Sequence, residues 1–367
     1  RGEAERLIVF GVVQGVGFRP FVYRLAHTLG LKGWVANAGF GVEIHIEGPS
    51  GKELAKFVTA LRKSPPPLAR IEKIEATPAT FSGCREFEIR KTKEGGGFVF
   101  ISPDIATCAD CRHEIRTAAE RRYRYPFTNC TNCGPRYTIV QRLPYDRPRT
   151  TMAGFPMCAV CRAEYSNPLD RRYHAQPIAC PVCGPHVTLR NARSGKTLAG
   201  GIPDAADLIA KGKIVAVKGL GGFHLVCDPF NRAAVRHLRR TKSRRTKPLA
   251  LMARDLATVE RFALVGPAER RLLLSERRPI VLLKKKPGAD IPLIAPNLDE
   301  IGFMLPYTPL HELLLEGLGL IVATSSNDKD APIIKDEAEG IRGLADYVLT
   351  HNRPIAMRAD DSVVKVA

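Results

Sequence analysis

The sequence has 367 residues, of which 44% are hydrophobic and 25% charged, as in ordinary soluble globular proteins, and this length predicts roughly two to four domains. No apolar run approaches the ~20 residues of a membrane-spanning helix and no signal peptide is evident, so we expect a cytoplasmic protein without membrane contact. A net charge of +19 is compatible with solubility alone, with nucleic acid as a partner or with phosphorylated small molecules, and its sign does not choose among them.

Strand and helix patterns alternate in the first segment, residues 1–91. Apolar residues predict a first strand at 7–13, and Phe18 begins a series of apolar residues at helical spacing. A second helix follows a capping box formed by Ser50 and Glu53. With the strands between and after these helices, the order is strand, helix, two strands, helix, strand. This order is typical of a ferredoxin-like α+β fold.

The loop between the first strand and helix carries a candidate anion site. It consists of Gln14, Gly15, Val16, Gly17 and Phe18, and Arg19 follows in the first turn of the helix. The helix dipole disfavours a cation at this end, whereas the two glycines allow successive backbone amides to face one anion. An arginine beside such amides can bind two phosphate oxygens at once. We therefore predict that an oxyanion lies between Arg19 and the loop amides.

Eight of the ten cysteines form four Cys-x-x-Cys pairs in the second segment, residues 92–190. The pairs recur at a period of 50, as Cys108, Cys111, Cys130 and Cys133 and then as Cys158, Cys161, Cys180 and Cys183. Each copy can close one tetrahedral thiolate site, so we predict two small modules with one structural Zn2+ each. The spacing also allows an interleaved pairing of the cysteines, or a ligand from His113 or His174.

The third segment, residues 191–367, alternates apolar strand patterns with helical stretches, which predicts an α/β domain with a mixed sheet. The expected strands lie at 214–218, 249–253, 280–284, 320–325 and 347–351. Between Arg236 and Lys247, seven of twelve residues are basic and none is acidic. Such a run is either a solvated helix face or a site for polyphosphate or RNA.

Two stretches near the start, GVVQGVGFR and GWVANAGFGVEIHIEG, resemble the acylphosphatase family over roughly the first 90 residues. The resemblance implies that Arg19 and the loop amides bind the phosphoryl group of an acyl phosphate. It also implies that Asn37 positions the attacking water. Such a cradle stabilises charge on the phosphoryl oxygens without a nucleophilic side chain. Phe40 stands where many members carry a polar residue, and the alternative is a ferredoxin-like fold with an inactive loop.

In the third segment, KGLGGFHLVCD, KPLALM and ATSSN resemble the YrdC/Sua5 family, which makes carbamoyl-type adenylates from ATP. The resemblance implies that Lys242 and Arg244 bind phosphates, and that Ser325 and Asn327 contact phosphate or ribose groups. His351 and Arg358 are further candidates for the nucleotide site. The same resemblance implies ATP as a substrate, together with Mg2+.

An acylphosphatase domain, paired four-cysteine modules and a YrdC-like domain, in this order, resemble the HypF-type hydrogenase maturation carbamoyltransferases. These proteins start the synthesis of the cyanide ligands of NiFe hydrogenase. The resemblance implies that the first domain hydrolyses carbamoyl phosphate to carbamate and phosphate, and that the YrdC-like domain joins carbamate to ATP as carbamoyl adenylate. A C-terminal transfer domain, which we expect to be absent from this chain, would pass the carbamoyl group to the partner protein HypE.

Two other interpretations compete with this one. In the first, the zinc modules and the basic run bind RNA, but the run lacks the interleaved aromatic residues on which bases stack, so we do not expect nucleic acid as a partner. In the second, the protein makes threonylcarbamoyl adenylate for tRNA modification, which leaves the acylphosphatase domain and zinc modules without a task.

Overall fold

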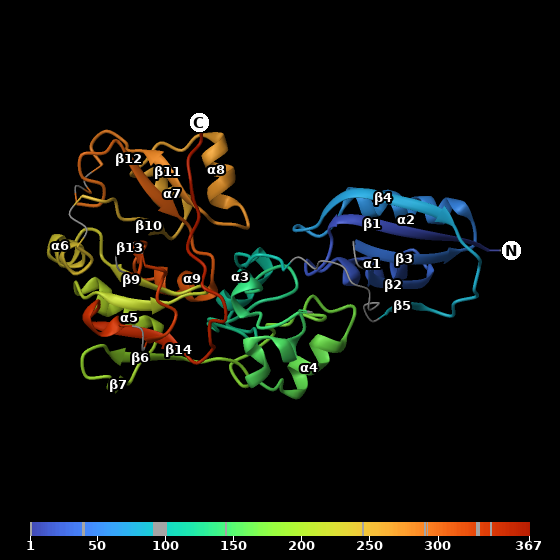
Figure 1. Cartoon of the computed structure of the whole chain (residues 1–367), viewed down its shortest axis with the longest axis horizontal. Coiled ribbons are helices and arrows are strands. Elements are labelled where there is room, and N and C mark those ends of the chain that lie inside the picture. Colours follow the sequence, from blue (N-terminus) through green and yellow to red (C-terminus); the bar gives the residue numbers. More distant parts are fainter. Residues whose placement is uncertain are drawn as a thin grey trace.

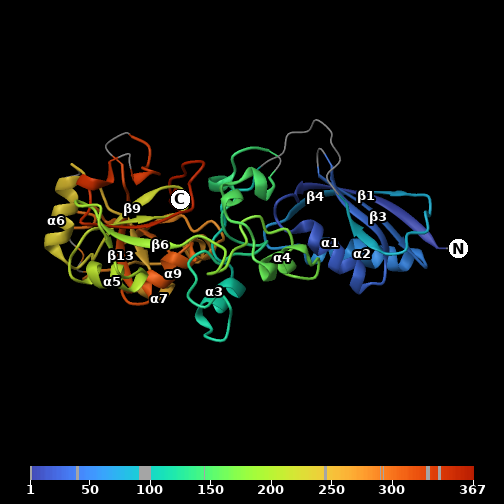
Figure 2. The same ribbon diagram turned by 90° about the horizontal axis from the view of Figure 1, so that it is seen from below.

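The computed structural model describes residues 2–38, 41–90, 101–143, 145–243, 246–289, 291, 293–327, 331–337 and 340–367. The molecule is elongated, with a sheet at each end and the cysteine-rich segment between them (Figures 1 and 2). No helix in the described ranges is long and apolar enough to cross a membrane.

The N-terminal sheet has five strands in the order β4-β1-β3-β2-β5. These are β1 (Glu3–Val12), β2 (Lys32–Ala38), β3 (Gly41–Gly48), β4 (Arg70–Pro78) and β5 (Phe87–Ile89). Helices α1 (Phe18–Thr28) and α2 (Gly51–Lys63) lie on one face of the sheet (Figure 2). There Phe18 and Phe57 are buried with alternate β3 residues such as Ile44, because side chains two apart in a strand share a face. The predicted ferredoxin-like fold is confirmed.

The predicted capping box of α2 is wrong in detail. Ser50 is the N-cap residue, but its hydroxyl makes no hydrogen bond to the helix backbone. It donates instead to the carboxylate of Glu53. The helix therefore begins where the sequence predicts, with a different use of the same two side chains.

The middle segment has little regular structure. Helices α3 (Ala109–Arg116) and α4 (Ala159–Ser166) each begin directly after the first cysteine of a copy. The apolar clusters around them are small and are built largely from cysteines, with Ile105 in the first copy and Ile178 in the second. Because so little apolar surface is buried, metal ligation is expected to supply much of the stability of this segment.

The C-terminal sheet has ten strands in the order β15-β11-β12-β10-β13-β9-β8-β14-β6-β7, with parallel and antiparallel pairs. They are β6 (Val187–Asn191), β7 (Thr197–Leu198), β8 (Val215–Lys218), β9 (Phe223–Cys227), β10 (Leu251–Ala253), β11 (Ile280–Lys284), β12 (Glu300–Met304), β13 (Leu320–Ser325), β14 (Tyr347–His351) and β15 (Val363–Val364). The helices are α5 (Ile202–Ala210), α6 (Arg232–Thr241), α7 (Leu256–Glu260), α8 (Pro267–Leu274) and α9 (Pro309–Leu315).

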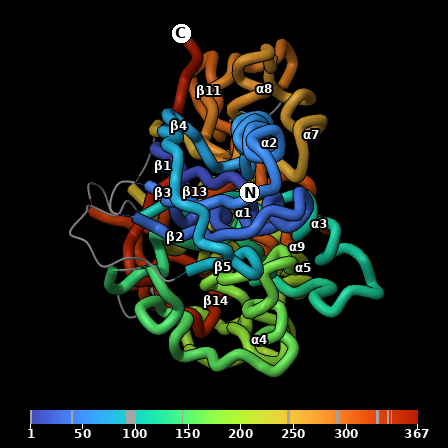
Figure 3. Tube along the Cα trace, turned by 90° about the vertical axis from the view of Figure 1, so that its right-hand side faces the viewer, coloured from blue at the N-terminus to red at the C-terminus, as the bar shows by residue number. Residues whose placement is uncertain are grey.

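Each of the five strands predicted for this segment is present, as β8, β10, β11, β13 and β14, and the sheet has five additional strands, β6, β7, β9, β12 and β15. Separate apolar clusters, one around Phe303 and one around Leu314, enclose the sheet. The last strand, β15, pairs with β11 at the sheet edge, which lies at the upper side of the molecule when seen along its long axis (Figure 3). The mixed α/β architecture predicted for the segment is confirmed.

Candidate active site and metal centres

The loop between β1 and α1 has the backbone that its glycines predict. Gly15 and Gly17 have φ angles of 71° and 74°, in the left-handed region that favours glycine. Among the described residues, none accepts a hydrogen bond from the backbone N–H groups of residues 14–19. Successive unpaired N–H groups at a helix N-terminus form a site for an anion.

Two polar side chains lie where this loop meets the hairpin of β2 and β3. Gln14 Nε2 donates to the carbonyls of Ala38 at 2.8 Å and Gly41 at 2.7 Å, so this side chain holds the loop in place and is not free for a ligand. Asn37, near the end of β2, has a buried Oδ1 that accepts no hydrogen bond from any residue that the structure describes. A buried acceptor of this kind is costly unless it binds water or a ligand.

The Arg19 side chain is half-buried and forms no hydrogen bond or ion pair with a described residue. Burial lowers its pKa, while Tyr173 and Asp146 act in the opposite direction. An arginine loses its proton only at very alkaline pH, so this guanidinium is a cation whose hydrogen-bond donors are available to an anion.

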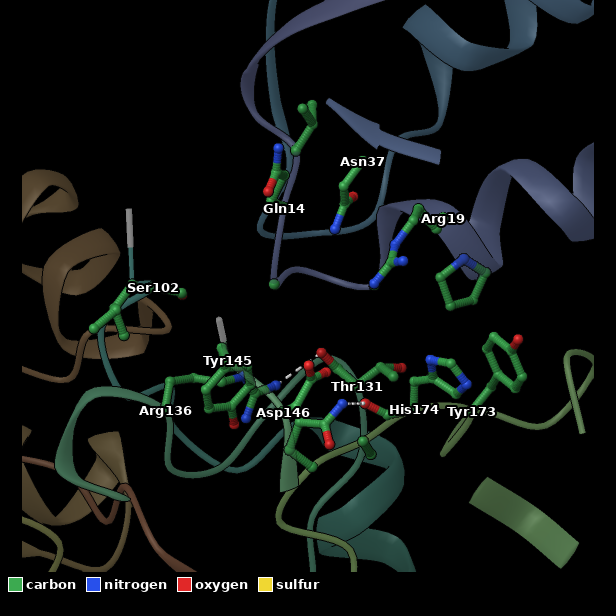
Figure 4. A pocket seen from close by; sticks show the side chains of 17 residues that line it. Gln14, Arg19, Asn37, Ser102, Thr131, Arg136, Tyr145, Asp146, Tyr173 and His174 are labelled. Atoms are coloured by element: carbon green, nitrogen blue, oxygen red, sulfur yellow. Dashed lines mark hydrogen bonds between the residues drawn. The ribbon is translucent and has the colours of Figure 1, made fainter. Parts of the chain in front are cut away.

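Arg19, Asn37 and the loop line a cavity of about 120 Å3, and the middle segment closes its other side (Figure 4). Thr131, Tyr145, Asp146, Tyr173, His174 and Gln176 lie there. Sequence reasoning missed all of these except His174, which it considered only as a zinc ligand or surface residue. No sequence signal identifies them, because they lie more than a hundred positions from Arg19 and meet it only through domain packing.

The eight paired cysteines form two separate groups, Cys108, Cys111, Cys130 and Cys133, and Cys158, Cys161, Cys180 and Cys183. In each group the four Sγ atoms lie within 4.8 Å of one another, with Sγ–Sγ separations such as 3.7 Å for Cys108–Cys130 and 3.8 Å for Cys158–Cys180. A tetrahedral zinc with Zn–S bonds of about 2.3 Å spaces its sulfurs by about 3.8 Å. Both groups fit one structural Zn2+ each, and neither the interleaved pairing nor a histidine ligand occurs.

Arginines of each cysteine copy reach into the other copy. Arg171 Nη1 lies 3.0 Å from Cys111 Sγ, and Arg122 Nη2 lies 3.5 Å from Cys161 Sγ. Arg122 is fully buried and also binds both carboxylate oxygens of Glu164. Guanidinium groups beside thiolate ligands offset part of the negative charge of a four-cysteine zinc centre. The two copies therefore form one unit.

In the C-terminal domain, three of the predicted nucleotide-site residues meet. Lys242 is buried at the end of α6, and its Nζ donates to the Ser325 carbonyl and, at 3.1 Å, to the Asn327 carbonyl. Ser325 Oγ donates to Asn327 Oδ1 at 2.8 Å. The Lys242 ammonium therefore brings a positive charge next to the Ser325 and Asn327 side chains. Arg244 lies outside the described residues.

The two remaining candidates are His351 and Arg358. His351, at the end of β14, is buried, and its ring packs edge-on against Phe127 of the middle segment at 5.1 Å. Burial lowers the pKa of His351 well below its usual value, so the ring is neutral. Arg358 is exposed, and its Nε donates to the Ile333 carbonyl at 3.0 Å. The described contacts of both residues do not include Lys242, Ser325 or Asn327.

Three regions of the chain match known families. Residues 5–89 match the acylphosphatase family, residues 107–140 and 157–190 the HypF finger, and residues 207–367 the Sua5/YciO/YrdC family described as telomere recombination. Fold, cysteine geometry and these matches define a multidomain protein that joins an acylphosphatase domain, two zinc fingers and a YrdC-like domain.

The whole chain is also similar to individual proteins. It is 49% identical over 385 residues to carbamoyltransferase HypF2 of Cupriavidus necator, covering 98% of this chain and 48% of that protein. It is 50% identical over 370 residues to carbamoyltransferase HypF of Rhodobacter capsulatus, covering 99% of this chain and 49% of that protein. The crystal structure of a full-length HypF in the phosphate- and nucleotide-bound form superposes with a TM-score of 0.92 at 45% identity, covering 100% of this chain and 48% of that one.

The chain belongs to the HypF carbamoyltransferase family. It spans about half the length of the relatives that it matches. The family predicted from the sequence is confirmed.

Proposed function

We propose that the cavity at Arg19 hydrolyses carbamoyl phosphate to carbamate and phosphate. The observation that carries this proposal is the combination of an unpartnered guanidinium with unpaired backbone N–H groups in one small cavity. Its volume is well below the roughly 300–1,000 Å3 of pockets for drug-sized ligands, so it suits a compact acyl phosphate.

In this mechanism the loop amides and Arg19 bind the phosphoryl oxygens. Asn37 Oδ1 accepts a hydrogen bond from a water molecule and aligns it with the phosphorus atom. The water oxygen forms a bond to phosphorus, while the bond from phosphorus to the acyl oxygen breaks and carbamate leaves with the electron pair. One water proton is lost to solvent or phosphate. The fixed donors stabilise charge that builds up on the phosphoryl oxygens.

We further propose that the YrdC-like domain converts carbamate and ATP into carbamoyl adenylate and pyrophosphate. The convergence of Lys242, Ser325 and Asn327 supports this, because an ammonium and two polar side chains at a strand end suit phosphate and ribose oxygens. Arg244 would add a second cation, and Mg2+ would offset phosphate charge. A carbamate oxygen attacks the α-phosphorus and pyrophosphate leaves. His351 and Arg358 stay candidates for the same nucleotide site.

Holding both reactions on one chain has a chemical reason. Free carbamate decomposes readily, so a short route between sites limits its loss to bulk water. The division into residues 1–91, 92–190 and 191–367 places the zinc fingers between the two sites. We propose that they act as a rigid spacer, in a cytoplasmic protein whose cysteines stay reduced.

Delivery of the carbamoyl group to HypE, for cyanide-ligand synthesis in NiFe hydrogenase, would need the half of the relatives that this chain does not match.

One experiment tests both sites. The chain is incubated with carbamoyl phosphate and Mg-ATP, and phosphate and pyrophosphate are followed separately. We expect Arg19→Ala to lower phosphate release by about 10²-fold or more, and Lys242→Ala to abolish pyrophosphate release while phosphate release continues. Unchanged phosphate release in Arg19→Ala would refute the first site, and ATP-dependent pyrophosphate release in Lys242→Ala would refute the second.

A further inference from the structure

The cavity at Arg19 contains an acidic residue that phosphate binding does not explain. Asp146 precedes a short helical turn at residues 147–149, is exposed, and lines the cavity on the side opposite Arg19 (Figure 4). Its side chain makes no hydrogen bond or ion pair with a described residue, and it does not cap the turn. A carboxylate facing a phosphate site repels the phosphoryl group, so a structural or phosphate-binding role does not account for it.

Arg136, the other cation in the cavity wall, does not neutralise Asp146. Its guanidinium donates to the carbonyls of Thr131 at 2.8 Å and Cys133 at 2.9 Å, and to two further carbonyls nearby. Arg19 is close enough for Asp146 to raise its pKa, yet the two form no ion pair. The cavity thus has a cation and hydrogen-bond donors at one end and an unpartnered acceptor at the other.

Other residues around Asp146 limit what can bind there. The Tyr173 ring is buried and stacks on His174 with ring centroids 4.1 Å apart, and His174 stacks on Tyr165 as well. Gln176 Oε1 already accepts bonds from the Arg147 N–H and the Tyr165 hydroxyl. The neighbouring aromatic rings offer only their faces, and the Gln176 amide oxygen already accepts two hydrogen bonds. Among these described residues, the Asp146 carboxylate is therefore the strong hydrogen-bond acceptor on this side of the cavity.

We propose that Asp146 of the zinc-finger segment is a specificity-determining residue of the acyl phosphate site, where it accepts a hydrogen bond from the N–H2 group of a carbamoyl phosphate. This inference rests on the proposed function of the cavity. A ligand with a phosphoryl group at one end and an N–H donor at the other satisfies both ends of the cavity. Acetyl phosphate has a methyl group in place of the N–H2, so it leaves the carboxylate unpaired beside the phosphoryl charge. The zinc finger thereby contributes selectivity that an isolated acylphosphatase domain lacks.

The test compares kcat/KM for carbamoyl phosphate and acetyl phosphate in the whole chain, following phosphate release. We expect Asp146→Ala to lower the ratio of the two values about tenfold, since a hydrogen bond to a charged group is worth at least this much. Asp146→Asn keeps an acceptor oxygen, and we expect it to lower the ratio less. Asp207→Asn, on the exposed side of α5, is the matched control and leaves the ratio unchanged.

The possible outcomes separate this inference from the proposed function. If kcat/KM in Asp146→Ala falls equally for both substrates, or does not fall at all, the ratio is unchanged. That result would overturn the role of Asp146, while Arg19-dependent hydrolysis stands. A wild-type chain that hydrolyses neither acyl phosphate would overturn the proposed function and this inference together. Circular dichroism and zinc content of each variant show whether a change in the ratio comes from misfolding.

Discussion

Arg122 of the first zinc finger and Glu164 of the second form a two-pronged ion pair, with Nη1–Oε1 at 3.0 Å and Nη2–Oε2 at 2.6 Å. Arg172, at the position equivalent to Arg122 in the repeat, pairs in turn with Glu114 of the first finger. Arg122 also reaches Glu114, at 3.2 Å, and Arg172 reaches Glu164, at 3.7 Å. The two fingers are therefore joined by a reciprocal network of buried charges.

Arg122 is the fully buried cation of this network, and its removal is expected to leave Glu114 and Glu164 with weaker compensation from the remaining arginines. We predict that Arg122→Met lowers the free energy of unfolding by about 3 kcal/mol, measured by urea unfolding of the zinc-loaded chain. Arg254→Met is the control, because Arg254 forms an exposed pair with Asp255 and exposed pairs contribute about 0–1 kcal/mol. Similar losses in the two variants would contradict the prediction.

The carboxylate of Glu164 makes the stability of the network dependent on pH. Burial alone would raise its pKa, but hydrogen bonding and charge from Arg122, with Arg172 and Arg121, lower the pKa to about 2. Since the folded pKa is below the ordinary 4.5, the stabilisation is complete above about pH 5 and is lost as pH falls toward 2. The stabilisation of the folded state by ionised Glu164 is on the order of 3 kcal/mol at neutral pH.

Comparison of wild type with Glu164→Gln isolates this effect, because zinc ligation responds to acid in both proteins. We predict that the difference in free energy of unfolding between them shrinks between pH 7 and pH 3. An equal difference at both pH values would show that Arg122 does not lower the pKa of Glu164.

Each group of four cysteines fits its own zinc, so the two sites are expected to lose metal separately. We predict that Cys180→Ser lowers the zinc content from two ions per chain to one, as measured by atomic emission, and that Cys133→Ser does the same. A chain without zinc in either single variant would indicate a shared site. Loss of the second zinc should also reduce acyl phosphate hydrolysis, because Tyr173 and His174 line the cavity and belong to the chain segment between Cys161 and Cys180.

Asn37 is expected to position the attacking water molecule and to make no contribution to phosphate binding. We predict that Asn37→Ala lowers kcat for acyl phosphate hydrolysis by about 10²-fold and leaves inhibition by inorganic phosphate nearly unchanged. Parallel loss of phosphate inhibition would instead place Asn37 among the groups that bind the phosphoryl oxygens.

Gly17 meets two constraints at once. An added Cβ would be strained at a φ of 74° and would lie 3.3 Å from Asn132 Oδ1 and 3.4 Å from Thr131 Cβ in the zinc finger. We predict that Gly17→Ala costs about 1–2 kcal/mol of stability and lowers acyl phosphate hydrolysis. Gly195→Ala is the matched control, since Gly195 has a φ of 70° with nothing within 4 Å of the added atom. Equal effects of both variants on hydrolysis would contradict a specific role of Gly17.

Much of the fold and of the candidate sites can be predicted from the sequence by itself, because these features depend on residues that are close together in the chain. The spacing of apolar residues predicted the ferredoxin-like order and five strands of the larger sheet, and four Cys-x-x-Cys pairs at a fixed period predicted two tetrahedral sites. Gly15 and Gly17 predicted a loop whose successive amides face one anion, and both residues have a left-handed φ in the structure. Each of these depends on residues that are neighbours in the chain, or on motifs whose ligand chemistry fixes their geometry.

Only the tertiary structure decided which residues face one another across domain boundaries. The repeat of Arg122 and Arg172 is visible in the sequence, but not that each arginine binds a glutamate of the other finger. Likewise, Asp146 and Tyr173 close the cavity of Arg19 from a different domain. Such contacts result from how folded surfaces pack together, and no periodicity or spacing along the chain specifies that packing.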